Sequence, residues 1–341
     1  MENTRKRAKP AWLNIVQRYQ TPTIPKSAWQ IINSFGPYIL TWFLMLYLLN
    51  VSIWLTLVLA PFAAGFLVRI FIIQHDCGHQ SFFKSRRANN ILGSLCGVLT
   101  LTPYNHWRTS HARHHANSGD LDFRGIGDVD TLTVDEYLAL PWRGKLRYRI
   151  YRSPWLLFFI TPSLLFIFAH RVAYKTNKAE KRARSSVRWT NVGIAALILV
   201  AGSLVGFKQL LFLQLPISMF AASAGVYLFY VQHQFEDTYW RRHNEWDYEN
   251  AALDGSSFFK LPKVLQWFSG NIGFHHVHHL NPKIPNYLLE QAHKENDIFH
   301  GVETLTIRKS ARSAFLHLWD EKSQQLISFR HLRKRKIRAL A

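Results

Sequence analysis

Cysteine is scarce in this chain, whose 341 residues include only Cys77 and Cys96. Two cysteines without C-x-x-C spacing exclude a disulfide framework. Cys77 stands among histidines, and we interpret it as a small packing residue because the histidines already supply ligands. No cleavable signal sequence is expected, since no apolar segment stands close behind the basic start MENTRKRAKP. This start is expected to be a cytoplasmic arm.

Acidic residues are also few, with 21 Asp and Glu against 42 Lys and Arg and a formal charge of +21. In a soluble protein this composition would suggest a nucleic-acid partner. Here aliphatic runs and 12 tryptophans favour a membrane protein with a basic cytoplasmic side, and no nucleic acid is expected. A carboxylate-bridged di-iron bundle is not indicated, because it requires two Glu-x-x-His motifs and only one occurs, Glu290 to His293.

Long apolar runs predict the fold class, an all-α integral membrane protein. Each run of about 20 residues is long enough to cross a hydrocarbon core of about 30 Å. Very short turns join the runs in pairs, so two hairpins are expected, with a cytoplasmic helical cap that holds a di-metal site. The four predicted spans are residues 31–50, 53–73, 189–207 and 209–231.

A fifth apolar run, Pro154–His170, has 17 residues and is interrupted by Pro162. If it crossed the membrane, the basic run Arg171–Arg188 would lie outside, against the positive-inside tendency. We therefore expect it to lie along the interface. The chain would then be a multi-pass membrane protein with both termini and all histidine-rich motifs in the cytoplasm.

Three histidine-rich motifs follow the pattern of a metal site. Spacings of three and four residues place imidazoles on one side of a helix, and neutral imidazole is the commonest metal ligand in proteins. Eight such ligands exceed one closed coordination sphere, which favours two metal ions, and imidazole suits iron, copper, nickel and zinc alike. The candidate ligands are His75, His79, His111, His114, His115, His275, His278 and His279.

The order HDCGH, HARHH and HHVHH, with the first motif closing a hydrophobic hairpin, resembles the membrane fatty acid desaturases, in particular the bacterial acyl-lipid branch. The flanking stretches HDCGHQSFF, QHQFEDTYW and GNIGFHHVHHLNPKIPNY strengthen the resemblance, which runs from about Ile31 to His293. It implies two non-haem iron ions, O2 as co-substrate, and a cis double bond formed in an acyl lipid. It also implies a ninth ligand, His233, directly after the last span.

Electrons are expected from a separate protein, because no glycine-rich dinucleotide fingerprint or haem-binding domain is recognisable. The resemblance suggests ferredoxin, flavodoxin or a small haem protein. Three parts of the chain are predicted: a basic arm at 1–30, a desaturase domain at 31–293, and a basic cytoplasmic tail at 294–341.

Metal-bound imidazoles usually donate their second ring N–H to an acid or a carbonyl. His276, inside the third motif but outside its H-x-x-H-H pattern, is also placed next to the metal ligands, whereas His106 and His243 are interpreted as structural. Asp128 and Asp130 are assigned to a solvated acidic loop. The candidate supporting carboxylates are Asp76, Asp120, Asp122, Glu236 and Asp237.

Two alternatives remain open from the sequence. The first is a related di-iron hydroxylase or ketolase that acts on lipids or carotenoids, and product analysis would distinguish it. The second is a metal transporter. The spans argue against transport, because they contain almost no ionisable groups apart from Arg69, which lies near one end.

Overall fold

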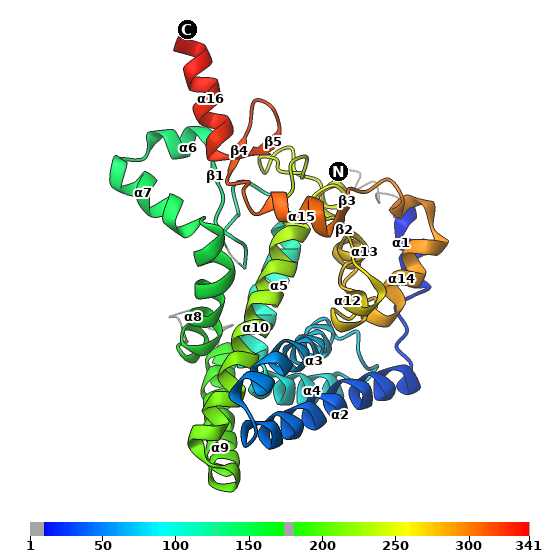
Figure 1. Cartoon of the computed structure of the whole chain (residues 1–341). Helices are drawn as coiled ribbons and strands as arrows, with labels where there is room; N and C mark the ends of the chain where they lie inside the picture. The colour runs from blue at the N-terminus through cyan, green and yellow to red at the C-terminus, as the bar shows by residue number, and fades with distance from the viewer. Residues whose placement is uncertain (1–9, 126, 174–180, 341) are drawn as a thin grey trace.

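The computed structural model describes residues 10–125, 127–173 and 181–340, with side chains up to Arg335. Helices dominate these residues, and four of them are long and apolar enough to cross a membrane (Figure 1). They form the two expected hairpins, and a cap of short helices and strands lies at one end of them. The four are α2 (Ile24–Leu49), α3 (Ile53–His79), α9 (Lys181–Val205) and α10 (Phe207–His233).

The spanning helices are longer than their apolar runs. The first histidine motif lies inside α3, which ends at Gln80 in the left-handed conformation (φ 59°). His233 is likewise the last residue of α10. The basic run before α9 joins the helix from Lys181 onward, and its part at 174–180 lies outside the described residues.

Local signals explain the tight hairpins. The Ser52 hydroxyl accepts a hydrogen bond from the backbone N–H of Trp54 (3.2 Å), which starts α3 directly after α2. Between α9 and α10 stands Gly206, whose φ of +94° is accessible to glycine at little cost.

The remaining helices line or cover the two hairpins. They are α1 (Ala11–Gln17), α4 (Arg86–Leu99), α5 (Tyr104–Asn117), α6 (Val134–Ala139), α7 (Trp142–Tyr151), α8 (Thr161–Ile167), α11 (Tyr248–Leu253), α12 (Lys263–Phe268), α13 (His275–Leu280), α14 (Asn286–Glu295), α15 (Ile307–Ser313) and α16 (Phe329–Leu340). Shorter turns are η1 (Leu156–Ile160, a π-helical turn), η2 (Ala169–Arg171) and η4 (Asp297–Phe299).

Two small sheets add strands that the sequence analysis did not predict. In the first sheet β4 (Leu318–Asp320) pairs in parallel with β1 (Leu132–Thr133) and antiparallel with β5 (Gln325–Ile327). In the second, β2 (Phe258–Lys260) pairs in parallel with β3 (Thr304–Thr306). The region expected to be a basic tail therefore contributes strands and the fully buried Trp319 to the cap.

The run expected along the interface, Pro154–His170, forms the second member of a bent pair of helices. The axis of α7 makes an angle of 55° with the segment Leu156–Arg171, which contains η1 and α8. By length and composition this pair is a broken span or a re-entrant segment.

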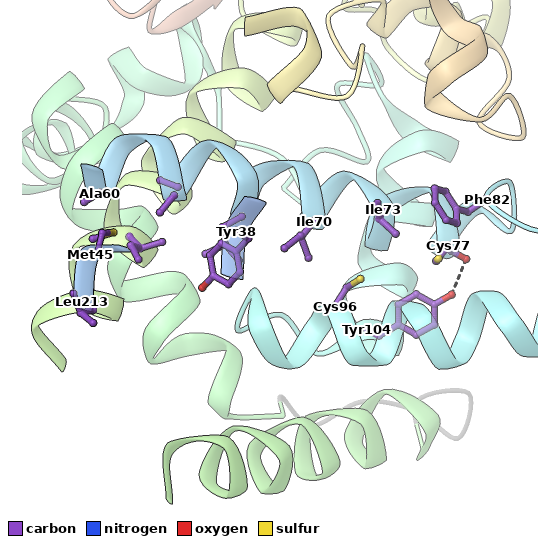
Figure 2. Close-up of a cluster of buried hydrophobic side chains, with 14 residues drawn as sticks. Tyr38, Met45, Ala60, Ile70, Ile73, Cys77, Phe82, Cys96, Tyr104 and Leu213 are labelled. Atoms are coloured by element: carbon purple, nitrogen blue, oxygen red, sulfur yellow. Dashed lines mark hydrogen bonds between the residues drawn. The ribbon is translucent and has the colours of Figure 1, made fainter. Parts of the chain in front are cut away.

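The core between the hairpins positions the histidine motifs. Buried side chains of α2, α3, α4 and α10 meet there, and both cysteines are free and buried among them (Figure 2). The Tyr104 hydroxyl donates a 2.6 Å hydrogen bond to the carbonyl of Cys77, which ties the start of α5 to the first motif. Arg69 lies over the ring of Trp267 (4.0 Å) and donates to its carbonyl and to Asn33, and no carboxylate of the described residues pairs with it.

Candidate metal centre

The structure gathers nine histidines into two clusters, each with ring nitrogens within 4.8 Å of one another. The clusters include His233, which brings the smaller one to four residues. The larger cluster contains His75, His79, His111, His115 and His278, and the smaller contains His114, His233, His275 and His279.

Helical geometry explains this division. On α5, His111 and His115 are one turn apart and join the larger cluster, while His114 points to the smaller one. On α13 the roles are exchanged: His275 and His279 join the smaller cluster, and His278 reaches the larger. Each H-x-x-H-H motif therefore serves both clusters.

Distances within the clusters fit metal coordination. Nε2 of His115 lies 3.0 Å from Nε2 of His278, and Nε2 of His233 lies 2.9 Å from Nε2 of His275. The His114 and His233 Nε2 atoms are 3.1 Å apart. Two metal–imidazole bonds of about 2.1 Å at right angles place their nitrogens about 3.0 Å apart. The donor set therefore fits two metal ions.

Burial favours the neutral form of several of the clustered imidazoles. It lowers the pKa of His111, His115 and His278 well below 6.5, and neighbouring imidazoles lower it further. The pKa values of His275 and His279 are lowered for the same reasons. Nε2 of His79 and of His279 are buried and have no protein hydrogen-bond partner among the described residues. Neutral rings with such free nitrogens are prepared to bind metal.

One predicted carboxylate lies against the larger cluster. Asp76 accepts a hydrogen bond from Nδ1 of His75 (3.1 Å) through one oxygen. Its other oxygen accepts from the backbone and side-chain nitrogens of Asn286 (2.7 and 2.8 Å). Asp76 thus links the first histidine motif to α14 of the cap.

The acid beside the smaller cluster is Asp128, which the sequence analysis assigned to a solvated loop. Its carboxylate accepts a hydrogen bond from Nδ1 of His114, and its side chain is only 14% exposed. Gly125 and Gly127 have positive φ (89° and 77°), so the loop can turn back toward α5. This G-x-G before an acid was the only sequence signal for the contact.

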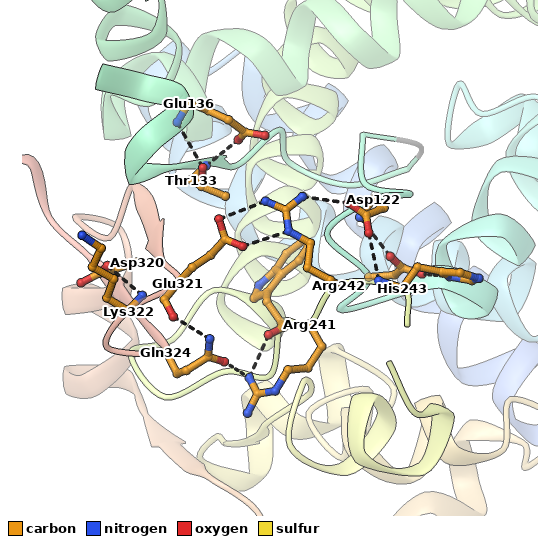
Figure 3. Close-up of polar contacts among 12 residues, drawn as sticks. Asp122, Thr133, Glu136, Arg241, Arg242, His243, Asp320, Glu321, Lys322 and Gln324 are labelled. Carbon is orange, nitrogen blue, oxygen red and sulfur yellow. Dashed lines mark hydrogen bonds and ion pairs between the residues drawn. The ribbon is translucent and has the colours of Figure 1, made fainter. Parts of the chain in front are cut away.

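Four predicted carboxylates lie elsewhere. Asp120 accepts from Nδ1 of His243 (2.7 Å). Asp122 pairs with Arg242 (2.8 Å), as Figure 3 shows. Glu236 and Asp237 are exposed. Nδ1 of His233 donates instead to the carbonyl of Gly255 (3.1 Å). A main-chain carbonyl leaves no signal in the sequence.

His276 is buried beside the clusters and belongs to neither of them. Its Nε2 lies 3.0 Å from Nδ1 of His293, whose ring packs against Phe258 and Phe274. It therefore joins α13 to α14, and His243 and His106 also lie outside both clusters.

A mostly apolar cavity of about 680 Å³ opens beside the clusters. His75, His111 and His275 reach its wall from α3, α5 and α13. From there it extends along α10 to Ser218, which is 15 residues before His233, or about 22 Å at 1.5 Å per residue. Phe71, Trp107, Leu165 and Phe229 are among its apolar walls.

These features define a multi-helix membrane protein whose histidine clusters are compatible with a di-metal site facing an apolar cavity. The family model described as fatty acid desaturase matches residues 52–301. The chain belongs to the fatty acid desaturase family, and it is an oxidoreductase of acyl chains.

Three relatives illustrate the similarity. The chain is 48% identical over 318 residues to a fatty acid desaturase of Bacillus subtilis (strain 168), which covers 93% of this chain and 90% of the relative. It is 27% identical over 242 residues to the sn-1 oleoyl-lipid 12-desaturase of Synechocystis, covering 67% and 66%. It is 26% identical over 232 residues to the sn-1 acyl-lipid omega-3 desaturase (ferredoxin) of Nostoc, covering 65% and 62%. These matches favour desaturation over hydroxylase, ketolase or transport activity.

Proposed function

We propose that this protein introduces a cis double bond into the acyl chain of a membrane lipid, with two iron ions held by its nine clustered histidines. The observation that carries the proposal is the juxtaposition of two imidazole clusters with one end of a long apolar cavity. The printed names of the Synechocystis and Nostoc relatives, both acyl-lipid desaturases, support an intact lipid as substrate.

Each histidine has an assigned place. His75, His79, His111, His115 and His278 would hold one ion, and His114, His233, His275 and His279 the other. When bound, the iron pair would supply the oxidising power for the reaction. One hydrogen leaves each of two adjacent methylenes, and these two hydrogens, with two electrons and two protons, reduce O2 to two waters. Asp76 and Asp128 hold the rings of His75 and His114 in orientation, and His276 braces α13.

The protein's own contribution is placement. Phe71, Trp107 and Phe229 form part of the cavity wall, and an apolar wall near the histidines would hold one methylene pair there and exclude water. The extension along α10 accepts the rest of the chain. The cavity has about the volume that a long apolar ligand requires.

Partners and location complete the proposal. The electron donor is a separate ferredoxin, flavodoxin or small haem protein, and the Nostoc relative's name specifies ferredoxin. The protein lies in the bacterial cytoplasmic membrane with its histidines and both termini in the cytoplasm. Its working unit is the 31–293 domain, with the 1–30 arm and the 294–341 region on the cytoplasmic side.

The test is expression of the chain in a host that lacks desaturases, followed by mapping of double bonds in its lipid fatty acids. We expect a new cis olefin and about two irons per purified chain. The His79→Ala variant should form no olefin and should contain less iron. An inserted hydroxyl or keto group in place of the olefin would overturn the proposal and indicate a related oxygenase.

A further inference from the structure

Helix α7 has one face that no other part of the described chain covers. Trp142, Leu146 and Ile150 recur every four residues along it and are 68%, 49% and 53% exposed. On the other side Tyr148 is buried, and its hydroxyl donates to the carbonyl of His317 (2.6 Å). One side of the helix is thus fixed to the cap, and a narrow apolar stripe on the other side is turned outward.

Cations flank this stripe. Arg143, Lys145, Arg147 and Arg149 all lie on α7, and no Asp or Glu occurs between Glu136 and Glu180. Arg143 and Arg147 are exposed. An apolar stripe with basic borders matches a surface of acyl chains under anionic headgroups.

Exposed apolar side chains also occur on the segment that follows α7. Beyond the bend, Trp155, Phe159 and Leu164 are 75%, 54% and 52% exposed. This segment packs on the spanning helix α10, where the ring of Phe158 contacts those of Tyr227 and Tyr230. The 55° bend turns α7 away from the axis of the segment Leu156–Arg171. Such a bend is expected where a helix leaves the bilayer core and then runs along the bilayer surface.

We propose that α7 is an interfacial helix that lies in the headgroup layer of the cytoplasmic leaflet. Its stripe enters the acyl region, and Arg143 and Arg147 contact anionic phospholipid headgroups. The helix α16 is not a suitable cover for the stripe, because its apolar residues Phe329 and Leu332 are already packed against the cap.

One consequence rests on the proposed function. Tyr151, the last residue of α7, lines the cavity next to the loop that carries Asp128 and Val129. If α7 lies at the membrane surface, the part of the cavity beside Tyr151 lies at the depth of the headgroups. There the acyl chain of an intact lipid can enter the cavity while the lipid stays in the leaflet.

The test uses nitroxide labels on full-length protein in lipid nanodiscs, since Cys77 and Cys96 are buried and stay unlabelled. Labels at Leu146→Cys and Ile150→Cys should be accessible to oxygen and protected from a nickel chelate. Labels at Arg147→Cys and at Phe315→Cys, an exposed apolar position of the cap, should show the opposite pattern. Nickel access to the labels at both 146 and 150 would overturn the proposal. The same result is expected if a protein partner, and not the bilayer, normally covers the stripe.

The headgroup contact is tested with the same labels. In nanodiscs with equal parts of phosphatidylcholine and phosphatidylglycerol, nickel access at 146 should fall several-fold relative to phosphatidylcholine alone. The Arg143→Gln/Arg147→Gln variant should lose this difference, and an unchanged difference would refute the assigned cations. Desaturation by the wild type is measured separately, so an inactive protein with the expected labelling pattern would overturn only the proposed function.

Discussion

At the scale of single residues, the support of the clusters shows where sequence reasoning works. Asp76 follows a cluster histidine directly on α3, so its place could be predicted from the helix. Asp128 reaches His114 through a loop whose path depends on two positive-φ glycines. No residue pattern predicts that the main-chain carbonyl of Gly255 lies beside His233. Contacts within a helix follow from spacing, whereas contacts made by loops follow from the completed fold.

We predict that Asp128→Ala weakens the smaller cluster. Without the acceptor, the ring of His114 loses its fixed tautomer and orientation, and metal affinity or activity should fall about 10–100-fold. Iron content and desaturation measure the effect. Asp130→Ala is the matched control, because Asp130 is exposed in the same loop and belongs to neither of the clusters found among the described residues. If the two variants behave alike, Asp128 does not support the smaller cluster, and its assignment to a solvated loop would be correct.

A second residue-scale prediction concerns His233. Three histidines would remain in the smaller cluster of the His233→Ala variant, so it should lose at most one iron and most of its desaturation. His243→Ala should keep both, since His243 pairs with Asp120 away from the clusters. A fully active His233→Ala protein with its complete iron content would remove His233 from the ligand set.

At the scale of elements, the segments around the α7–α8 bend are joined by a buried cation. Arg152 is 0% exposed, and its guanidinium donates to the carbonyls of Asp130 and Leu316 and to side chains of Tyr230 and Gln234, at 2.9–3.1 Å. No carboxylate is among these acceptors. The acceptors come from the loop before β1, from α10 and from the stretch before β4. Arg152 therefore joins three segments that are distant in sequence.

Arg152→Met should destabilise the protein by about 3 kcal/mol or more, because several buried acceptors lose a charged donor. Thermal unfolding in detergent at a fixed scan rate should show a lower midpoint. The exposed Arg147→Met on α7 is the control and should leave the midpoint unchanged. If Arg152→Met also leaves it unchanged, the bend is held by packing alone.

Directly before β4 stands a histidine, His317, that makes stability depend on pH. Burial, and then Arg152 and Arg149, lower the pKa of His317 to about 3. In the unfolded chain it titrates near 6.5. Between these values the unfolded state binds the proton first, so stability is complete above about pH 6.5 and declines as the pH falls.

This histidine should cost about 2 kcal/mol of stability at pH 5. Unfolding of the metal-free protein between pH 7 and 4 measures the slope, and His317→Phe should reduce it. The exposed His331→Phe is the control. A slope that His317→Phe does not change would assign the pH dependence to the cluster histidines.

At the scale of the whole molecule, hydropathy predicted the four spans because membrane crossing depends on the sum of many side chains. Their ends were not predicted, since polar turns such as His75 to His79 stay helical only where other helices cover them. The cap strands have two or three residues each, too few for a recognisable alternation. The region 294–341 was predicted to be a basic tail because of its charge, although Trp319 and Leu326 in it are fully buried.

Topology is the last prediction, and the clusters constrain it. Each cluster combines residues from before and after the segment 142–205, so the chain between His115 and His233 must cross the membrane an even number of times. With α9 and α10 as two crossings, the α7–α8 pair must enter and leave on the same side. Reporters fused at 51 and 208 should therefore be found outside, and those at 120, 180, 250 and 335 in the cytoplasm. The contradicting result is an outside signal at 180 together with cytoplasmic signals at 120 and 250. It would mean that the α7–α8 pair crosses the membrane and that α9 and α10 do not both cross it, so the two-hairpin arrangement would be wrong.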